Sequence, residues 1–278
     1  MNRLLFLVFS LLFLNCFGQL ELPFKNKQLI NSQTTIIPDG FDFTIQHRFG
    51  QIALDKSLYE DFLGFDLPAN IRFSLSYKLG ERAYIGIGRT KINKTIDLEG
   101  KYVLAKQSEA MPLSIALYSS VGLRTASFEI GNNTFKTDSI TPFEYLFIHK
   151  LDYNTQLILS KSINSTLAIQ VSPTIIYKNL VQYGDNNFNL AIPFSGKYQY
   201  SFGSSVLFEY GYCIGREGSL LNHPMSIGFE FGTAGHVFQV FATNSSSLRE
   251  TNLYTSEVSD LKQKEFLLGF NIRRVWWF

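Results

Sequence analysis

The sequence predicts an all-β protein, an antiparallel up-and-down transmembrane β-barrel of about 12 strands. Apolar and polar residues alternate at period two in segments of about ten residues, the pattern of a strand with one lipid-facing and one lumenal face. Long and short connections alternate along the chain, and the last strand ends in aromatic residues. A mean hydropathy of +0.03 in a chain with 26 Phe and 14 Tyr also indicates that apolar and polar residues are interleaved along the sequence.

The alternation is clearest in four segments, residues 41–49, 71–79, 205–214 and 225–232. In the first of these, Phe41 and Phe43 share one face and Asp42 the other. Weaker alternation predicts eight more strands, at residues 83–91, 95–106, 113–123, 145–160, 166–179, 187–198, 236–243 and 266–278. Because proline removes a ladder donor, we expect a bulge or interruption near Pro173 and Pro193.

The connections favour a membrane barrel over a soluble one. Those after odd-numbered strands include the long segments 50–69, 124–144 and 244–264, whereas those after even-numbered strands, such as 80–82 and 234–235, are short. Long loops outside and short turns inside are typical of outer-membrane barrels. An even strand count also predicts that both termini are periplasmic. A secreted β-sandwich or soluble ligand-binding barrel is the less favoured alternative.

The C-terminal strand supplies an independent indication. Phe270, Ile272, Trp276 and Phe278 fall on one face at period two, as in the terminal signal that the barrel assembly machinery recognises. Arg274 shares this lipid-facing phase and would extend its charge to the headgroups. We therefore expect the assembly machinery and the lipid bilayer as partners.

The N-terminus has the layout of a secretory signal peptide. Arg3 precedes an apolar run from Leu4 to Leu14, too short for a spanning helix, and cleavage is expected near Gly18. Lipidation of Cys16 is the alternative. The predicted organisation is a signal peptide at 1–18, a periplasmic segment at 19–39 and a barrel domain at 40–278, located in the outer membrane.

Several short motifs together resemble a known family. They are Gln46-His47-Arg48-Phe49-Gly50, Ala69-Asn70-Ile71-Arg72, Ile85-Gly86-Ile87-Gly88-Arg89, Gln170-Val171-Ser172-Pro173, Gly235-His236-Val237-Phe238-Gln239 and Gly269-Phe270-Asn271-Ile272-Arg273-Arg274. In this order, over nearly the whole mature chain, they resemble the uncharacterised β-barrel family known as domain of unknown function family 5777. The resemblance implies a Gram-negative outer-membrane barrel of unassigned activity, with no catalytic residues to carry over.

The sequence favours a protein that is not an enzyme. The histidines, His47, His149, His223 and His236, show no close metal-ligand spacing and no defensible nucleophile partner. Gly86-Ile87-Gly88 lies within an alternating strand and lacks the third glycine and helix of a phosphate loop. After export only Cys213 remains as a thiol, which excludes a disulfide framework. We expect no catalytic residue, no metal and no cofactor, and the near-neutral charge argues against nucleic acid.

Charged side chains on the polar phase are expected to converge in the lumen. The candidates are Arg48, Arg72, Lys78, Glu99, Lys101, Asp152, Glu209, Glu230 and Arg273. Charges removed from bulk water need partners, and a barrel of this size lies between solid eight-stranded barrels and open porins. A closed, ion-paired interior is therefore favoured over an open pore.

Two functions follow from this architecture. The first is a narrow channel or transporter, in which lumenal charges bind or steer a small solute. The alternative is a structural or docking barrel that binds a periplasmic or surface protein through its long loops.

Overall fold

The computed structural model describes residues 24–54, 59–128, 141–233 and 235–276. Its strands are β1 (Phe41–Ala53), β2 (Asn70–Leu79), β3 (Ala83–Thr90), β4 (Thr95–Ala105), β5 (Ser114–Arg124), β6 (Leu151–Ser162), β7 (Leu167–Val171), β8 (Thr174–Lys178), β9 (Phe188–Ser201), β10 (Ser204–Cys213), β11 (Met225–Gly232), β12 (His236–Thr243) and β13 (Glu265–Trp276). The expected signal peptide and Phe278 lie outside the described residues.

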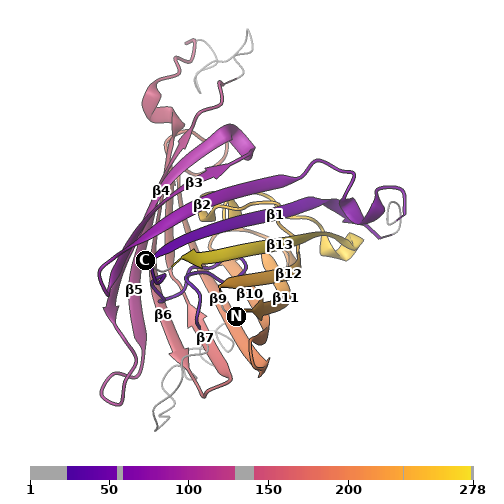
Figure 1. The fold of residues 1–278 in the computed structure, drawn as a ribbon. Coiled ribbons are helices and arrows are strands. Elements are labelled where there is room, and N and C mark those ends of the chain that lie inside the picture. Colours follow the sequence, from indigo (N-terminus) through magenta and orange to yellow (C-terminus); the bar gives the residue numbers. More distant parts are fainter. Residues whose placement is uncertain (1–23, 55–58, 129–140, 234, 277–278) are drawn as a thin grey trace.

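The strands form one closed antiparallel barrel (Figure 1). Consecutive strands pair with each other except β7 and β8, and β1 pairs with β13, where Phe41 lies opposite Trp276. β7 and β8 occupy one position, because both pair with β6 on one side and β9 on the other. The barrel therefore has 12 strand positions, one of them filled by two short strands, which confirms the predicted class and count.

The two prolines interrupt the same place in the wall. Pro173 separates β7 from β8, and its carbonyl accepts a hydrogen bond from Leu157 N at 3.0 Å. Pro193 lies within the continuous strand β9, and its carbonyl accepts a hydrogen bond from Ser172 N at 2.9 Å. Because neither proline can donate, the ladder between these strands breaks where the two prolines meet.

The period-two alternation determines which side chains face lipid. In β4, Leu98 and Tyr102 are 62% and 49% exposed, whereas Asp97, Glu99 and Lys101 between and beside them are 5% exposed or less. The same alternation of exposed and buried positions runs through the other strands of the wall. Apolar side chains thus form the outer surface and polar side chains line the lumen.

Long and short connections lie at opposite ends of the barrel, here called the loop end and the turn end. Short helices occupy the loop end: η1 (Phe62–Gly64), η2 (Ile92–Lys94), η3 (Phe147–Lys150), η4 (Leu220–Asn222), α2 (Glu250–Leu253) and η5 (Leu261–Gln263). The expected strand from residue 145 begins later, at Leu151, because residues 147–150 form η3. The helices of the described residues are all too short or too polar to cross a bilayer.

Two segments fold into the lumen. Residues 24–36, here the lumenal hairpin, reverse direction through a turn in which Leu29 N donates to Ser32 O at 2.9 Å and Thr34 N donates to Lys27 O at 2.9 Å. Residues 244–256, here the inward loop, carry α2 and are largely buried. Residues 24–36 are part of the segment 19–39 that was predicted to be periplasmic. The structure places them inside, where their polar groups contact the lumenal wall.

A charge on the lipid-facing surface tests this arrangement. Leu98→Arg places a guanidinium near the middle of β4, and we expect it to destabilise the folded barrel by about 2–4 kcal/mol. Phe202→Arg is the control, since Phe202 is 95% exposed in a turn between β9 and β10 and the cost should be at most about 1 kcal/mol. Urea unfolding in lipid vesicles, followed by gel mobility, measures both. Equal effects of the two variants would contradict the assigned lipid-facing surface.

Candidate functional site: the filled lumen

All nine candidate lumenal charges lie on the inward phase of their strands. Seven are 8% exposed or less: Arg48, Arg72, Glu99, Lys101, Glu209, Glu230 and Arg273. The other two lie near the ends of the barrel. Lys78 pairs with Asp39 and Glu81 at the turn end, and Asp152 lies at the start of β6 at the loop end. A role of these nine side chains in binding or steering a solute stays a prediction.

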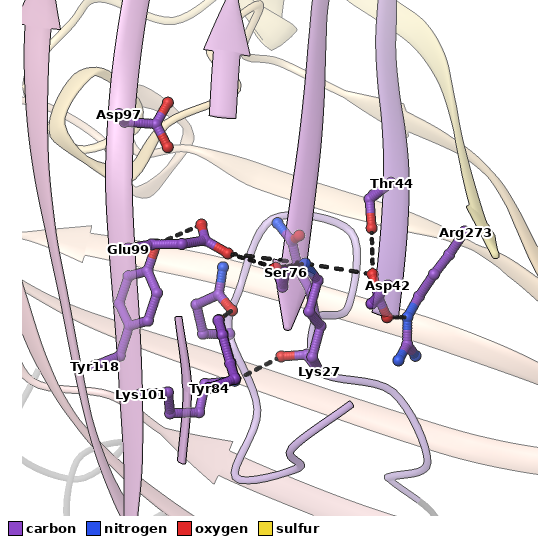
Figure 2. Close-up of polar contacts among 12 residues, drawn as sticks. Lys27, Asp42, Thr44, Ser76, Tyr84, Asp97, Glu99, Lys101, Tyr118 and Arg273 are labelled. Carbon is purple, nitrogen blue, oxygen red and sulfur yellow. Dashed lines mark hydrogen bonds and ion pairs between the residues drawn. The ribbon is translucent and has the colours of Figure 1, made fainter. Parts of the chain in front are cut away.

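Lys27 of the lumenal hairpin lies between two carboxylates of the wall (Figure 2). Its Nζ is 3.3 Å from Asp42 Oδ1 and 3.7 Å from Glu99 Oε1, and it donates to Ser76 Oγ at 2.6 Å. Lys101 Nζ in turn donates to the Lys27 carbonyl at 2.9 Å. Lys27 is 1% exposed, so its ammonium depends on these partners for stabilisation.

The wall carboxylates also pair with arginines of the wall itself. Arg72 Nη2 lies 2.5 Å from Asp97 Oδ2 and 3.1 Å from Glu99 Oε2. Asp42 pairs with Arg273, whose Nη1 donates to Asn26 Oδ1 of the hairpin at 2.6 Å. The wall thus carries its own ion pairs, and the hairpin adds further contacts to them.

Glu209 holds the tip of the hairpin. Its carboxylate accepts hydrogen bonds from Asn31 N at 2.9 Å, Ser32 N at 3.0 Å and Asn31 Nδ2 at 2.9 Å. Arg48 Nη2 donates to Asn31 Oδ1 at 2.8 Å, and the Arg48 guanidinium lies over the Phe241 ring at 4.2 Å. A charged acceptor and a charged donor therefore fix the same residue of the turn, which makes these bonds stronger than neutral ones.

A third group of wall residues contacts the hairpin near its turn. Lys197 Nζ lies 2.5 Å from Glu230 Oε1, and Gln239 Nε2 donates to Glu230 Oε2 at 2.8 Å. Asn271 Nδ2 donates to Gln239 Oε1 at 2.8 Å and to the Ile30 carbonyl at 2.9 Å. This network links β9, β11, β12 and β13 to the hairpin.

The inward loop is held by Arg249. Its guanidinium makes a two-point contact with Asp152, at 2.9 Å from Nη1 and 2.5 Å from Nη2, and its Nε lies 3.5 Å from Asp97. Gly122 on β5 lies directly behind this guanidinium, and a Cβ there would overlap it. Gly211 on β10 leaves room in the same way for the ring of Tyr254. Glycine on the inner wall thus permits the close approach of the loop.

The hairpin and the inward loop meet inside the barrel. Gln33 Nε2 of the hairpin donates to Glu250 Oε1 of α2 at 3.3 Å. Tyr84 OH donates to Gln33 Oε1 at 3.1 Å, and Gln170 Nε2 donates to the Gln33 carbonyl at 2.7 Å. Segments that enter from opposite ends of the barrel are therefore bridged at Gln33.

Several buried polar atoms along the wall have no protein partner among the described residues. They include both side-chain polar atoms of Asn154, Oε1 of Gln156, Oε1 of Gln170 and Oγ1 of Thr251. Buried polar groups of this kind are ordinarily satisfied by ordered water. The filled lumen thus retains hydrogen-bonding capacity beyond the contacts of its own side chains.

The histidines take structural positions at the barrel ends. The His47 ring stacks on Phe270 at 4.9 Å, and His223 Nδ1 accepts from Cys213 N at 3.0 Å. His236 lies 2.7 Å from Arg274, whose guanidinium is 5.4 Å from the Trp276 ring. Within the part of the chain that the structure describes, no group of three His, Cys, Asp or Glu side chains could hold a metal ion. The assembly role of Phe270, Ile272, Trp276 and Phe278 stays a prediction.

The sequence did not identify some of the residues that form the lumenal contacts, for two different reasons. Asp97 and Lys197 share the inward phase of the charges that were identified, so strict period-two counting would have found them. Lys27, Arg249 and Glu250 lie in segments without periodicity. Nothing in the sequence around these three indicates that they lie in the lumen.

The docking of the inward loop is expected to depend on pH through Glu250. Burial raises the pKa of Glu250 to about 7, opposed by hydrogen bonding to its own backbone and by Arg72, and reinforced by Glu99. The docked state therefore favours the protonated acid. Docking should be strongest below about pH 4.5 and should weaken as the pH rises through about 7.

A fluorophore at Ser256→Cys, in a Cys213→Ser background, reports this docking through quenching by acrylamide. Quenching should increase between about pH 5 and about pH 8 in the parent. The profile should be flat in Glu250→Gln, which keeps a neutral side chain of the same size. Identical pH profiles in the two proteins would contradict the assignment to Glu250.

Comparison with known proteins agrees with this architecture. The NanC porin structure matches with a TM-score of 0.51 and 7% identity, over 84% of this chain and 100% of that chain. The KdgM porin structure matches with a TM-score of 0.48 and 8% identity, over 84% and 99%. No curated protein matches the sequence. The profile of a family described as a membrane bound beta barrel domain, domain of unknown function 5777, matches residues 24–276, and the chain belongs to that family.

Proposed function

We propose that this protein is an outer-membrane channel for a small polar solute, closed in the described state by the lumenal hairpin and the inward loop. The observation that carries the proposal is the polar character of the contacts between these segments and the wall. The hairpin is held by Asp42, Glu99 and Glu209 through ion pairs and hydrogen bonds. The channel conducts when the hairpin leaves this position and the inward loop, which loses its hydrogen bond to Gln33, is loosened.

Polar contacts make such a movement energetically accessible. A hydrogen bond to a charged group contributes about 1.5–3 kcal/mol net and a neutral one about 0.5–1.5 kcal/mol, because water replaces it when it breaks. The apolar part of the interface consists of four side chains of the hairpin packed against the wall, namely Phe24, Leu29, Ile30 and Ile36. Its exposure costs about 1.5–3 kcal/mol for each side chain, which keeps the hairpin in place at rest.

Several ion pairs lie wholly within the wall and do not depend on the hairpin, whereas Glu209 takes its hydrogen bonds from the hairpin. Within the wall, Arg72 stays paired with Asp97 and Glu99. Arg273 likewise stays paired with Asp42, and Lys197 with Glu230. Removal of Lys27 therefore leaves no wall carboxylate of these pairs without a cation. An emptied lumen would present a hydrated, charge-paired surface, as a polar solute requires.

The proposed orientation follows the lengths of the connections. The loop end faces outward and the turn end faces the periplasm, as is typical of single-chain outer-membrane barrels. Both termini of the barrel, near Phe41 and Trp276, then lie at the periplasmic end. Export through a cleaved signal peptide at residues 1–18 is part of this proposal.

A reversible tether tests whether the hairpin closes the channel. Ser195 Oγ donates to Ser32 Oγ at 2.9 Å, so Ser32→Cys with Ser195→Cys, in a Cys213→Ser background, places two thiols across the hairpin and β9. In planar bilayers we expect conductance events from the reduced protein and their loss on oxidation. Deletion of residues 26–34 should give larger and longer openings, because the lumen then holds only the inward loop.

Two controls make this experiment decisive. Ser32→Cys alone should not respond to oxidant, and heat-modifiable gel mobility establishes that each variant is a folded barrel. A folded deletion variant that stays silent in the bilayer would overturn the proposal. Conductance that persists in the oxidised, tethered protein would show that the hairpin does not close the channel.

The docking function remains as a second candidate for one loop. The inward loop is unavailable to a partner in this state because Leu248, Arg249 and Leu253 are buried. The connection between β1 and β2 instead exposes Tyr59 and Phe62, at 91% and 65%. If docking is the function, a stoichiometric partner should co-purify and be lost in Tyr59→Ser with Phe62→Ser. Retention of that partner in the double variant would exclude this loop.

A further inference from the structure

A group of cations lies on the outer surface at the loop end. Arg89 is the second-last residue of β3, and Lys91 and Lys94 flank the turn through η2. We call these three residues the basic rim. Arg124 ends β5 beside them, on the inward phase of its strand. Thr125 Oγ1 donates to Lys94 O at 2.5 Å and Thr125 N donates to the same carbonyl at 3.3 Å, which joins the β3–β4 turn to the end of β5. The basic rim is therefore one continuous patch of the surface.

The cations are positioned by contacts with neutral groups. Arg89 Nη1 donates to the Lys94 carbonyl and, at 2.9 Å, to Thr125 Oγ1. Lys91 Nζ donates to Ala69 O at 2.8 Å, and the Arg124 guanidinium lies 4.7 Å from the Phe128 ring. Arg124 Nε is buried and has no partner among the described residues. These contacts fix the side chains without neutralising their charge.

No carboxylate pairs with the basic rim in the described part of the chain. This distinguishes it from the charges elsewhere in the barrel, where Lys78 has Asp39 and Glu81, and Lys197 has Glu230. Three neighbouring cations with no carboxylate partner among the described residues repel one another and attract an anion of more than one negative charge. The patch is thus complementary to a multiply charged anionic group.

The surface below the basic rim is apolar and exposed. Arg89 lies on the outward phase of β3, opposite Phe73 of β2 and Ile96 of β4. Phe73, Ile87, Ile96 and Leu98 are 41%, 49%, 37% and 62% exposed. Because this wall faces the acyl chains of a bilayer, the cations stand at the level where lipid headgroups begin. A soluble anion would make no contact with the apolar part of this surface.

We propose that the basic rim binds a lipid whose headgroup carries more than one phosphate charge, in the leaflet at the loop end. The phosphates pair with Arg89, Lys91 and Lys94, and the acyl chains lie along Phe73, Ile96 and Leu98. Arginine offers two parallel donors to phosphate, which favours this headgroup over a zwitterionic one. The site does not depend on whether the lumen opens.

The test measures lipid retained by the full chain in phosphatidylcholine nanodiscs that contain a minor fraction of diphosphorylated lipid A. Native mass spectrometry after extraction counts the bound molecules. Each basic residue near an anionic lipid contributes about fivefold to binding, so Arg89→Gln with Lys91→Gln and Lys94→Gln should reduce lipid A retention by at least about tenfold. Retention of phosphatidylcholine should not change.

The matched control removes three cations at the opposite end, by Lys78→Gln, Arg82→Gln and Lys106→Gln, and should leave lipid A retention unchanged. Equal loss in both triple variants would overturn the site, because net charge alone would then explain binding. Equal retention by the parent and the basic-rim variant would overturn it as well. Competition by inorganic phosphate at concentrations that displace lipid A would show a free anion site instead of a lipid site.

Discussion

The need to compensate charges inside a closed wall governs the rest of this structure. Closure of β1 on β13 forces every second side chain into a confined interior, and many of these side chains are charged. A charge buried away from water is tolerated only with partners. Asp42, Glu99 and Glu209 find part of their compensation in backbone N–H groups and a lysine of the lumenal hairpin. The hairpin is therefore the complement of the wall, and its position follows from the positions of the charges.

Space imposes a second condition, which the wall meets with small residues. The inward positions that face Arg249 and Tyr254 are glycines, Gly122 and Gly211, and Gly88 leaves room for Arg72. The glycines of β3 leave room for charged side chains of the neighbouring strands, Gly86 for Glu99 and Gly88 for Arg72 and Asp97. Large side chains fill the lumen at these points because the adjacent wall residue is a glycine. Shape and charge are therefore matched at the same points.

The period-two pattern predicted the barrel well because each strand is a local structure with one lipid face and one lumenal face. The nine charges that it assigned to the lumen, from Arg48 on β1 to Arg273 on β13, lie on the inward phase of their strands, as do Asp97 and Lys197, which were not singled out. It could not place residues 24–36, whose short hairpin is stabilised by long-range contacts such as that of Asn31 with Glu209. The same holds for Arg249, which is recognised as lumenal only once Asp97 and Asp152 lie beside it. Local patterns thus specify the wall, and tertiary contacts specify what fills it.

The contact between Gln33 and Glu250 connects two segments that enter the barrel from opposite ends. If one of them leaves, the other loses a hydrogen bond and gains access to water, so the stabilities of the two docked segments are coupled. Such coupling is reciprocal: whatever displaces the hairpin from the turn end loosens the inward loop by the same free energy as displacement of the loop loosens the hairpin. Tyr84 and Gln170 hold Gln33 from the wall in either case, which limits the coupling to the part carried by Glu250. The filled lumen is therefore a single linked network, in which an event at one face of the membrane changes the stability of a segment that reaches the other.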